Sequence, residues 1–444
     1  MYVYEILEAT NGKLISGDKN TDIVSFSQDS RKVKAGGMYI PLKGERFDGH
    51  SFIDSAFENG AQAIITHQKV SYPDKIVIEV ADTMQALKDM ALYLRQHRNV
   101  LVVGITGSVG KTSTRDMVYS VVKQKYKTLK TDGNYNNEIG LPLTVLRYDD
   151  EEVMILEMGM NHLGEMSRLS KIALPDIAAI TNVGTAHIGE LGSRENILKA
   201  KLEITDGMKD GNCLIINQDN DMLQTVDIPR LNVVRVGKDK KSQILAKNIE
   251  LNETSSSFTV EYNGKEELIH VPVQGEHNVS NALTAIAVGL ELEIDIEDIK
   301  KGIQSFELTK NRMDILEKDH HVTVIDGTYN ASVDSMKSSI DVLANYSRRK
   351  VAILADMLEL GNYSEKLHRE VGQYVVDKHI DVLICVGKEA YYMFDQAKKQ
   401  LENVFYYENN QQLIHDLKDM ICENDIVLLK GSHSMNLKEV VDVI

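Results

Sequence analysis

Short apolar runs alternate with amphipathic stretches through the middle of this 444-residue chain. From about Leu101 to Arg312, each run is long enough for a buried strand, and the stretch after it carries apolar residues at helical spacing. Strands that are apolar on both faces and alternate with helices predict a parallel sheet covered by helices on both sides. We expect strands at LVVG, VMILE, DIAAIT and CLIIN, and helices at TRDMVYSVVKQ, GEMSRLSKIA, ENILKAKLEI and HNVSNALTAIAVGLEL.

The region before residue 98 mixes shorter elements. The stretch from His50 to Gly60 predicts a helix that ends at this glycine, followed by a strand at about residues 61–66. Asp82 is typical of a helix N-cap, because the residues after it place one apolar face on a helix: Leu87, Met90, Ala91 and Leu94.

The last third of the chain repeats the alternation of strand and helix. VTVID, KVAILAD, DVLICVG and DIVLLKG each precede a helical segment, which predicts a doubly wound, Rossmann-like sheet. Between about Asn217 and Pro272, the β-like pieces NVVRVG, SFTVEY and LIHVPV indicate an antiparallel insertion or edge. The predicted fold is therefore α/β with three domains: a smaller N-terminal α/β domain (residues 1–97), a central parallel-sheet domain (98–312) and a C-terminal Rossmann-like domain (313–444).

Composition narrows the function classes. A formal net charge of −16 disfavours broad binding to nucleic acid or to an anionic membrane, although it permits a local basic pocket. No apolar run approaches the length of a transmembrane helix, and the first residues, MYVYEILEATNGK, lack the pattern of a secretory signal. The cysteines form neither a disulfide framework nor a zinc pattern, so we expect buried thiols in a reducing cytoplasm: Cys213, Cys385 and Cys422.

A glycine-rich turn, TGSVGKTS at residues 106–113, joins the first central strand to its helix. Glycines let backbone N–H groups turn toward phosphate oxygens, and the helix N-terminus adds a partial positive charge. Lys111 would reach the β- and γ-phosphates, and the Thr112 hydroxyl would hold Mg²⁺. The full G-x-x-x-x-G-K-[ST] pattern needs glycine where Ile105 stands, so a glycine turn that caps an ordinary helix is the alternative. The buried strand before the turn and the helix after it favour a phosphate-binding P-loop.

Two further side chains follow neighbouring strands. Glu157 ends the strand VMILE, and His187 lies six residues after the next strand ends near Thr181. In an open parallel sheet the ligand binds outside the carboxyl ends of the strands, so both side chains are expected beside Lys111. A solvated loop acid is the alternative for Glu157, and spacing alone leaves His187 undecided between ligand and core residue. In the predicted helix that carries Lys199 and Lys201, the residue pattern indicates only a solvent-exposed face and marks neither lysine as special.

Eight segments, in chain order, resemble the Mur ligases, cytoplasmic ATP-dependent enzymes that build the peptidoglycan peptide: GITGSVGKTST, TDGNYNNEIGLPLT, ILEMGMNHLGEM, ITNVGTAHIGELGS, KAKLEI, GEHNVSNALTAIAVG, DGTYN and KGSHSM. The N-terminal DSRKVKAGGMYIPLKGERFDGH resembles the family's UDP-sugar-binding domain, so the resemblance covers nearly the whole chain. NYNNEIGLPLT, EMGMN and LADMLELG favour the branch that adds D-Ala-D-Ala to UDP-N-acetylmuramoyl-tripeptide.

The resemblance implies a reaction and a role for each domain. The N-terminal domain would bind the UDP precursor, the central domain ATP, and the C-terminal domain would close over the cleft. ATP would phosphorylate the terminal carboxylate of the precursor, and the amine of D-Ala-D-Ala would attack the acyl phosphate. Two Mg²⁺ ions would screen the repulsion between carboxylate and γ-phosphate. The family also implies a monomer.

Site residues follow from the same resemblance. Thr112 and Glu157 would bind one Mg²⁺, and Glu157, His187 and Lys201 the other. A lysine cation cannot ligate Mg²⁺, but in the family the lysine fourteen residues after the histidine is carbamylated, and Lys201 has that spacing. Together with Lys111 these form the expected catalytic set: Lys111, Glu157, His187 and Lys201.

The expected binding residues fall into two groups. ATP would contact Thr106, Gly107, Ser108, Val109, Gly110, Lys111, Thr112, Ser113, Asn137, His277, Asn278, Asn281, Arg312, Asp326, Tyr329 and Asn330. The other substrates would contact Ser30, Arg31, Asp48 and His50 at the UDP-sugar end, and Lys430, Ser432 and Ser434 in the KGS loop. On charge alone, the DSR stretch fits a surface salt bridge or a cap equally well.

The chain departs from the family pattern at four positions. Val109 replaces the usual asparagine of the P-loop, which should be tolerated because backbone amides cradle phosphate. Ser332 and Val333 replace Asn-Pro, and His433 replaces arginine, so the C-terminal contacts to ATP are expected to differ in detail.

Two other functions stay open from sequence alone. One is a sister Mur-type ligase with a different amino-acid acceptor. The other is a P-loop switch that signals through nucleotide-dependent conformation, and a switch has no need for Glu157, His187 and a modified Lys201 in one cleft.

Overall fold

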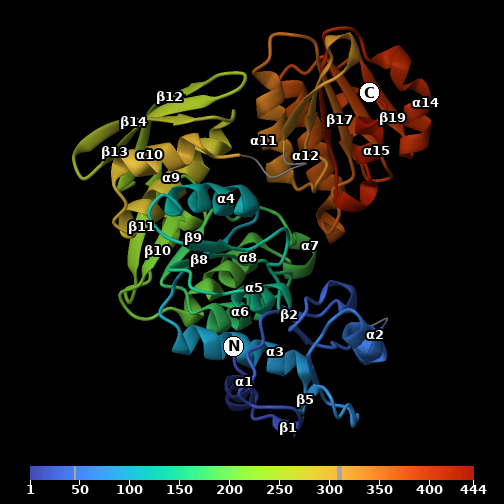
Figure 1. Cartoon of the computed structure of the whole chain (residues 1–444). Helices are drawn as coiled ribbons and strands as arrows, with labels where there is room; N and C mark the ends of the chain where they lie inside the picture. The colour runs from blue at the N-terminus through green and yellow to red at the C-terminus, as the bar shows by residue number, and fades with distance from the viewer. Residues whose placement is uncertain (45–46, 308–312) are drawn as a thin grey trace.

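The chain folds around three separate sheets, which divide it in sequence order (Figure 1). The computed structural model describes residues 1–44, 47–307 and 313–444. These residues form sheets of five, nine and six strands, and the domain with the nine-stranded sheet lies between the other two. The predicted three-domain α/β fold is confirmed. None of the helices in the described ranges is both long and apolar enough to cross a membrane.

The N-terminal sheet has the order β1-β5-β4-β3-β2 and is parallel except where β1 meets β5. Asp82 caps α3 by accepting a hydrogen bond from the backbone N–H of Gln85, as predicted. The single helix expected from His50 to Gly60 is wrong in detail, because a 3₁₀ turn, Gly49–Phe52, precedes a shorter α2. The elements are α1 (Val3–Thr10), β1 (Lys13–Ser16), β2 (Phe26–Ser27), β3 (Met38–Tyr39), α2 (Ile53–Glu58), β4 (Ala63–Thr66), β5 (Ile76–Glu79) and α3 (Thr83–His97).

The central sheet has the order β14-β13-β12-β11-β10-β9-β6-β8-β7. Its strands are β6 (Leu101–Thr106), β7 (Thr128–Lys130), β8 (Val153–Glu157), β9 (Ile177–Ile180), β10 (Cys213–Asn217), β11 (Asn232–Gly237), β12 (Ile244–Leu251), β13 (Ser256–Tyr262) and β14 (Lys265–Val271). The antiparallel edge predicted after Asn217 is only partly right. NVVRVG forms β11, which pairs in parallel with β10, and the antiparallel ladders begin between β12 and β13.

Helices cover both faces of the central sheet. They are α4 (Lys111–Val122), α5 (Gly140–Val145), α6 (Glu165–Ala173), α7 (Ile188–Leu191), α8 (Arg194–Leu202), α9 (Glu276–Glu291) and α10 (Ile296–Gln304). Successive β6 residues point to opposite faces: Val103 packs in the core with α4 and α9, and Val102 in the core with α3 and α6. This two-sided burial is what the unbroken apolar strands predict.

The C-terminal sheet has the order β15-β16-β20-β17-β18-β19 and is parallel except for β15. The four predicted strands are present, but the edge strands β15 and β19 are additional. β15 has only two consecutive apolar residues, and β19, although its residues VFYY are apolar or aromatic, is nowhere fully buried. The elements are β15 (Asp314–Glu317), β16 (Thr323–Asp326), α11 (Val333–Ala344), β17 (Lys350–Ala355), α12 (Ser364–Asp377), β18 (Val382–Val386), α13 (Tyr391–Ala397), β19 (Val404–Tyr407), α14 (Asn410–Met420), β20 (Ile426–Lys430) and α15 (Lys438–Val441).

The three thiols are free, but they are not all buried. Cys213 and Cys385 lie inside strands β10 and β18, and burial raises the pKa of each thiol. Cys422 is exposed, so the expectation of buried thiols is wrong for this residue. It lies in the turn between α14 and β20, where the apolar periodicity stops.

A buried arginine attaches the N-terminal domain to the central one. Arg95 on α3 donates to the carbonyls of Ala173 (2.7 Å), Leu174 (3.0 Å) and Val100 (2.8 Å). Two of these carbonyls end α6, where intrahelical donors run out. The apolar face of α3 also packs against α5 and α6, so α3 belongs to both cores.

We predict that Arg95→Leu destabilises the N-terminal and central domains by about 3–5 kcal/mol, because it leaves three buried carbonyls without donors. Urea unfolding followed by circular dichroism measures this loss. The matched control is Arg147→Leu, because Arg147 pairs with Asp132 at an exposed site. Its effect should stay within about 0.5 kcal/mol. Equal losses in both variants would contradict the assigned role of Arg95.

Candidate active site

The glycine-rich turn lies between the end of β6 and the start of α4, as predicted. Gly110 has φ 81°, a left-handed conformation that glycine adopts without strain. At Gly107, an added Cβ would lie 1.9 Å from the Thr181 hydroxyl, so only glycine fits there. The amides of Ser108 and Val109 are already bonded to Asn182. The N–H groups that can face a phosphate are therefore those at the N-terminus of α4.

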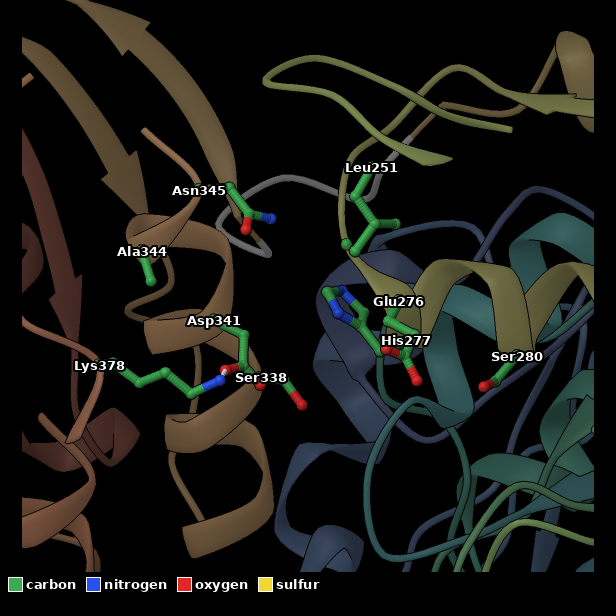
Figure 2. A pocket seen from close by; sticks show the side chains of 10 residues that line it. Leu251, Glu276, His277, Ser280, Ser338, Asp341, Ala344, Asn345 and Lys378 are labelled. Atoms are coloured by element: carbon green, nitrogen blue, oxygen red, sulfur yellow. Dashed lines mark ion pairs between the residues drawn. The ribbon is translucent and has the colours of Figure 1, made fainter. Parts of the chain in front are cut away.

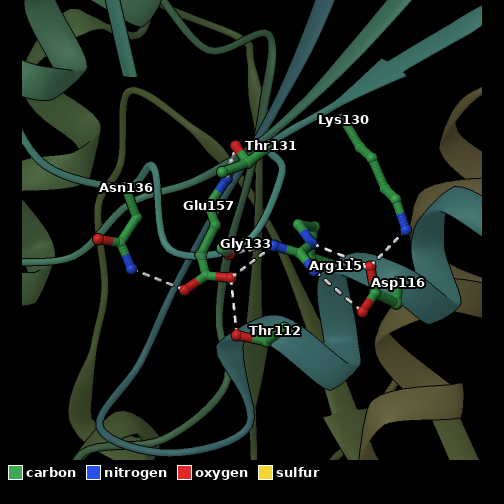
Figure 3. Close-up of polar contacts among 8 residues, drawn as sticks. All are labelled: Thr112, Arg115, Asp116, Lys130, Thr131, Gly133, Asn136 and Glu157. Atoms are coloured by element: carbon green, nitrogen blue, oxygen red, sulfur yellow. Dashed lines mark hydrogen bonds and ion pairs between the residues drawn. The ribbon is translucent and has the colours of Figure 1, made fainter. Parts of the chain in front are cut away.

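Glu157 is held at the carboxyl end of β8 by four partners (Figure 3). Its Oε2 accepts hydrogen bonds from the Thr112 hydroxyl (2.8 Å) and from Arg115 (3.2 Å), and its Oε1 accepts one from Asn136 (2.8 Å). Its backbone N–H donates to Thr131. The P-loop threonine and the predicted metal carboxylate are thus in direct contact, and Glu157 is only 2 % exposed. A carboxylate beside a hydroxyl is a donor set that suits Mg²⁺.

Arg115 extends this contact into a buried network of charges. It makes a two-pronged ion pair with Asp116, and Lys130 also donates to Asp116 at 2.7 Å. Two carboxylates are therefore matched by two cations, which satisfies the requirement that buried charges be paired. Sequence reasoning missed Arg115, although it lies three residues after Thr112 on α4 and so shares its face.

Asn136, and not only its neighbour Asn137, belongs to the site. Asn137 lines the cleft, but its side chain accepts from the amides of Ile139 and Gly140 at the start of α5. The side chain that contacts Glu157 is that of Asn136. The sequence offered two adjacent asparagines and no signal to separate their roles.

His187 and Lys201 are both in environments that favour their neutral forms. Burial, together with the charges of Lys111 and Lys201, lowers the pKa of His187 to about 4. Burial, together with the charge of Lys111, holds the pKa of Lys201 well below its ordinary value. Within the described ranges, the Lys201 amine makes no hydrogen bond or ion pair, and its residue is 2 % exposed. A neutral imidazole can bind a metal, whereas a protonated one cannot.

The unmodified side chains do not complete a metal site by themselves. The described parts of the chain hold no group of three or more His, Cys, Asp or Glu residues arranged to bind an ion. An ion at Thr112 and Glu157 would therefore need phosphate or water oxygens, which Mg²⁺ ordinarily retains. An ion at His187 would need a further anionic ligand.

A cleft of about 840 Å³ opens between the central and C-terminal domains beside the P-loop. It gathers most of the predicted ATP and KGS-loop residues: Ser108, Val109, Gly110, Lys111, Thr112, Ser113, Asn137, Glu157, His187, His277, Asn281, Tyr329, Asn330, Lys430, Ser432 and Ser434. Other predicted residues do not line it: Thr106, Gly107, Lys201, Asn278 and Asp326. Arg312 lies outside the described residues.

Three of the predicted residues support the wall of the cleft through contacts behind it. Asp326 is fully buried and pairs with Lys438 at 3.0 Å. Asn278 donates to the carbonyl of Gln274, and Asn281 accepts from the Thr114 hydroxyl at 2.8 Å. The last bond connects α9 to α4 directly behind the P-loop.

A second cavity, of about 390 Å³, adjoins the cleft through His277, Ser280 and Ser338 (Figure 2). Asp341 on α11 points into it and pairs with Lys378 at 2.5 Å. Neither residue stands out in the sequence, because they are an ordinary surface pair until the C-terminal domain lies against α9. Burial lowers the pKa of His277 to about 4, so its ring is neutral here.

The four residues predicted for the UDP-sugar end lie on two 3₁₀ turns of the N-terminal domain. Ser30 is buried, and Arg31 is exposed and pairs with Asp29 at 2.9 Å. Asp48 contacts His50 Nδ1 at 2.7 Å, and the buried Nε2 of His50 has no hydrogen-bond partner among the described atoms. None of the four lines the cleft.

The departures from the family pattern have local explanations. Ser332 is the N-cap of α11 and accepts from the amide of Ser335, which serine does well. Val333 begins that helix and is buried. Val109 is held by its backbone, which bonds Asn182 and Thr181. His433 lines the cleft near Tyr329, with ring centroids 6.1 Å apart.

Comparison with known proteins places the chain in a family. Residues 22–95 match the Mur ligase family catalytic domain, residues 105–289 the Mur ligase middle domain, and residues 311–433 the Mur ligase glutamate ligase domain. UDP-N-acetylmuramoyl-tripeptide–D-alanyl-D-alanine ligase of Bacillus subtilis (strain 168) is 38% identical over 99% of this chain and 97% of its own length.

Solved structures agree. The crystal structure I of MurF from Acinetobacter baumannii is similar with a TM-score of 0.90 and 30% identity, covering 100% of this chain and 98% of the other. MurF ligase from Thermotoga maritima in complex with ADP has a TM-score of 0.83 and 30% identity, covering 94% and 96%. The P-loop threonine contacts a glutamate at the end of a strand, and the similarity extends along the whole length of the chain. This chain therefore belongs to the Mur ligase family.

Proposed function

We propose that the chain is an ATP-dependent ligase that joins D-Ala-D-Ala to the terminal carboxylate of a UDP-N-acetylmuramoyl-tripeptide and releases ADP and phosphate, a cytoplasmic step of peptidoglycan synthesis. The observation that carries the proposal is 38% identity, over 99% of the chain, to a relative named for that activity. The contact between Thr112 and Glu157 in a cleft beside a P-loop supports it independently.

The chemical problem is to bring an anionic carboxylate against an anionic phosphate. The N-terminal amides of α4 and the Lys111 ammonium face the cleft and favour the triphosphate. From the C-terminal domain, Lys430 lines the opposite wall. Because the cleft is partly desolvated, each of these charges acts more strongly than it would in water.

Two Mg²⁺ ions would supply the remaining charge neutralisation. Thr112 and Glu157 would hold one between the phosphates, and their contact in the structure fits that role. Arg115 and Asn136 orient the Glu157 carboxylate from behind. His187 and Lys201 would hold the other, together with Glu157.

The environment of Lys201 supports its carbamylation. An amine whose pKa is lowered by burial is largely uncharged, and an uncharged amine can attack CO₂ to form a carbamate. The carbamate is an anion with two oxygens, which supplies the further ligand that the unmodified residues lack. The charge of Lys111, which acts on Lys201, favours the negative charge.

The two outer domains have complementary roles in the proposal. The N-terminal domain would hold the UDP-sugar end through Ser30, Arg31, Asp48 and His50. The C-terminal domain contributes Tyr329, Asn330 and the KGS loop to the cleft, and its docking would exclude water from the acyl phosphate. Since one chain supplies both walls of the cleft, the enzyme is proposed to act as a monomer.

We predict that phosphate is released from ATP only when both UDP-N-acetylmuramoyl-tripeptide and D-Ala-D-Ala are present. A phosphate-release assay across a panel of amine acceptors measures this directly. Equal rates with D-glutamate, lysine or glycine would indicate a sister ligase, and nucleotide turnover that ignores every acceptor would indicate a switch.

We predict that Lys201→Ala lowers amide formation by at least about 100-fold, because it removes a metal ligand and not merely an outer-shell partner. Short carboxylic acids should restore part of the rate, whereas bicarbonate should not. Carbon-13 NMR with labelled bicarbonate should show a carbamate in the wild type only.

The control is Lys199→Ala, because Lys199 lies on the same helix but is exposed. Its rate should match that of the wild type. An unchanged rate in Lys201→Ala would overturn the proposed second metal site.

A further inference from the structure

The loop after β17 docks against the short helix α7 of the central domain. The N–H of Gly189 donates to the carbonyl of Glu359 at 3.1 Å, and the Tyr363 hydroxyl donates to the carbonyl of Gly192 at 2.7 Å. Glu359 and His187 both line the cleft. The docking contact therefore lies at the edge of the proposed second metal site.

Within this contact, a carboxylate from one domain meets an imidazole from the other. Glu359 Oε2 lies 2.8 Å from His187 Nδ1. The pair has the distance of a hydrogen bond but not its alignment, since the ring N–H is not directed at the carboxylate. A turn of the ring would direct it there and leave Nε2 as the free ligand atom of a neutral imidazole.

The backbones on both sides of the pair adopt an uncommon conformation. His187 and Glu359 each have φ 64°, the left-handed region that non-glycine residues seldom occupy. Each such residue costs of order 1–3 kcal/mol unless its surroundings hold it. On the side of Glu359, neighbouring bonds do so: the Leu358 N–H donates to Ser432, and the Met357 N–H donates to His368.

The docked loop leaves no room for a side chain at Gly189. An added Cβ there would lie 2.6 Å from the Glu359 carbonyl oxygen and 2.8 Å from the Gly361 nitrogen. Its three nearest atoms all belong to residues 359–361 of the C-terminal domain. A methyl group at this position would thus obstruct docking, because the nearest atoms that it meets belong to the C-terminal domain.

We propose that Glu359 is a positioning residue that couples docking of the C-terminal domain to the orientation of the His187 ring, so that the second metal site is completed only in the docked state. This inference rests on the proposed function for the identity of that site. Glu359 lies on the far wall of the cleft, in the C-terminal domain. The P-loop and the metal ligands all belong to the central domain, so none of them can couple docking to the orientation of the His187 ring.

Two variants separate the side chain from the docking. Glu359→Ala removes the carboxylate but keeps the carbonyl that accepts from Gly189. Gly189→Ala keeps the carboxylate but obstructs docking. Mn²⁺ binding in the presence of ADP, followed by electron paramagnetic resonance, measures the metal site, and hydrogen–deuterium exchange of residues 185–192 measures docking.

We expect Glu359→Ala to weaken binding of the second Mn²⁺ by about 10–100-fold while residues 185–192 stay protected from exchange. Glu359→Gln, which keeps an acceptor oxygen, should lose less Mn²⁺ affinity than Glu359→Ala. Gly189→Ala should lose both the protection and the metal affinity. In the ligase assay, Glu359→Ala should lower kcat and leave the KM for ATP nearly unchanged.

The control is Glu365→Gln, because Glu365 is an exposed carboxylate of the same domain that pairs with Arg369. It should bind Mn²⁺ as the wild type does. Wild-type Mn²⁺ affinity in Glu359→Ala, or lost protection with unchanged affinity in Gly189→Ala, would overturn the inference. A wild type that forms no amide would instead defeat the proposed function, and the metal and exchange measurements would still decide the coupling.

Discussion

Burial of the Glu157 carboxylate is the constraint on which the rest of the site depends. A carboxylate that is 2 % exposed needs partners for its charge and its lone pairs, and it takes them from two segments: Thr112 and Arg115 on α4, and Asn136 before α5. The same bonds that satisfy Glu157 therefore fix the P-loop helix against β8. A divalent ion that replaced the Thr112 hydrogen bond would find both of its protein ligands already in contact.

The cleft carries basic groups although the whole chain is acidic. The net charge is −16, yet Lys111 and Lys430 line the cleft, and Arg115 lies directly behind it. Burial, together with the charge of Lys111, lowers the pKa values of both His187 and Lys201. The Lys111 charge that attracts phosphates thus acts with burial to favour a neutral imidazole and a neutral amine.

The two outer domains are attached in physically different ways. The N-terminal domain shares helix α3 with the central core, and the buried Arg95 donates to three carbonyls across the boundary. The C-terminal domain meets the central one through loops, where polar contacts such as the Thr185 amide with Asp334 and the Tyr363 hydroxyl with Gly192 accompany apolar ones. Polar loop contacts of this kind permit reversible docking. Motion for catalysis is therefore expected on the C-terminal side.

By itself, the sequence determined the features that depend on neighbouring residues: the apolar strands that became β6, β8 and β10, the cap at Asp82 and the glycine turn before Lys111. It missed the edge strands β15 and β19, because β15 has only two consecutive apolar residues and the four-residue run VFYY of β19 is too short to distinguish an edge strand from a loop. Only the tertiary structure decided which side chains meet. The contact of Arg115 with Glu157, the choice of Asn136 over Asn137, and the approach of Glu359 to His187 join segments far apart in the chain. Helical periodicity left Lys201 as one of two lysines on a helix, and the resemblance to the family favoured it by its distance from His187. The structure supplies the physical difference, because Lys201 is buried and removal of water is what favours the neutral amine.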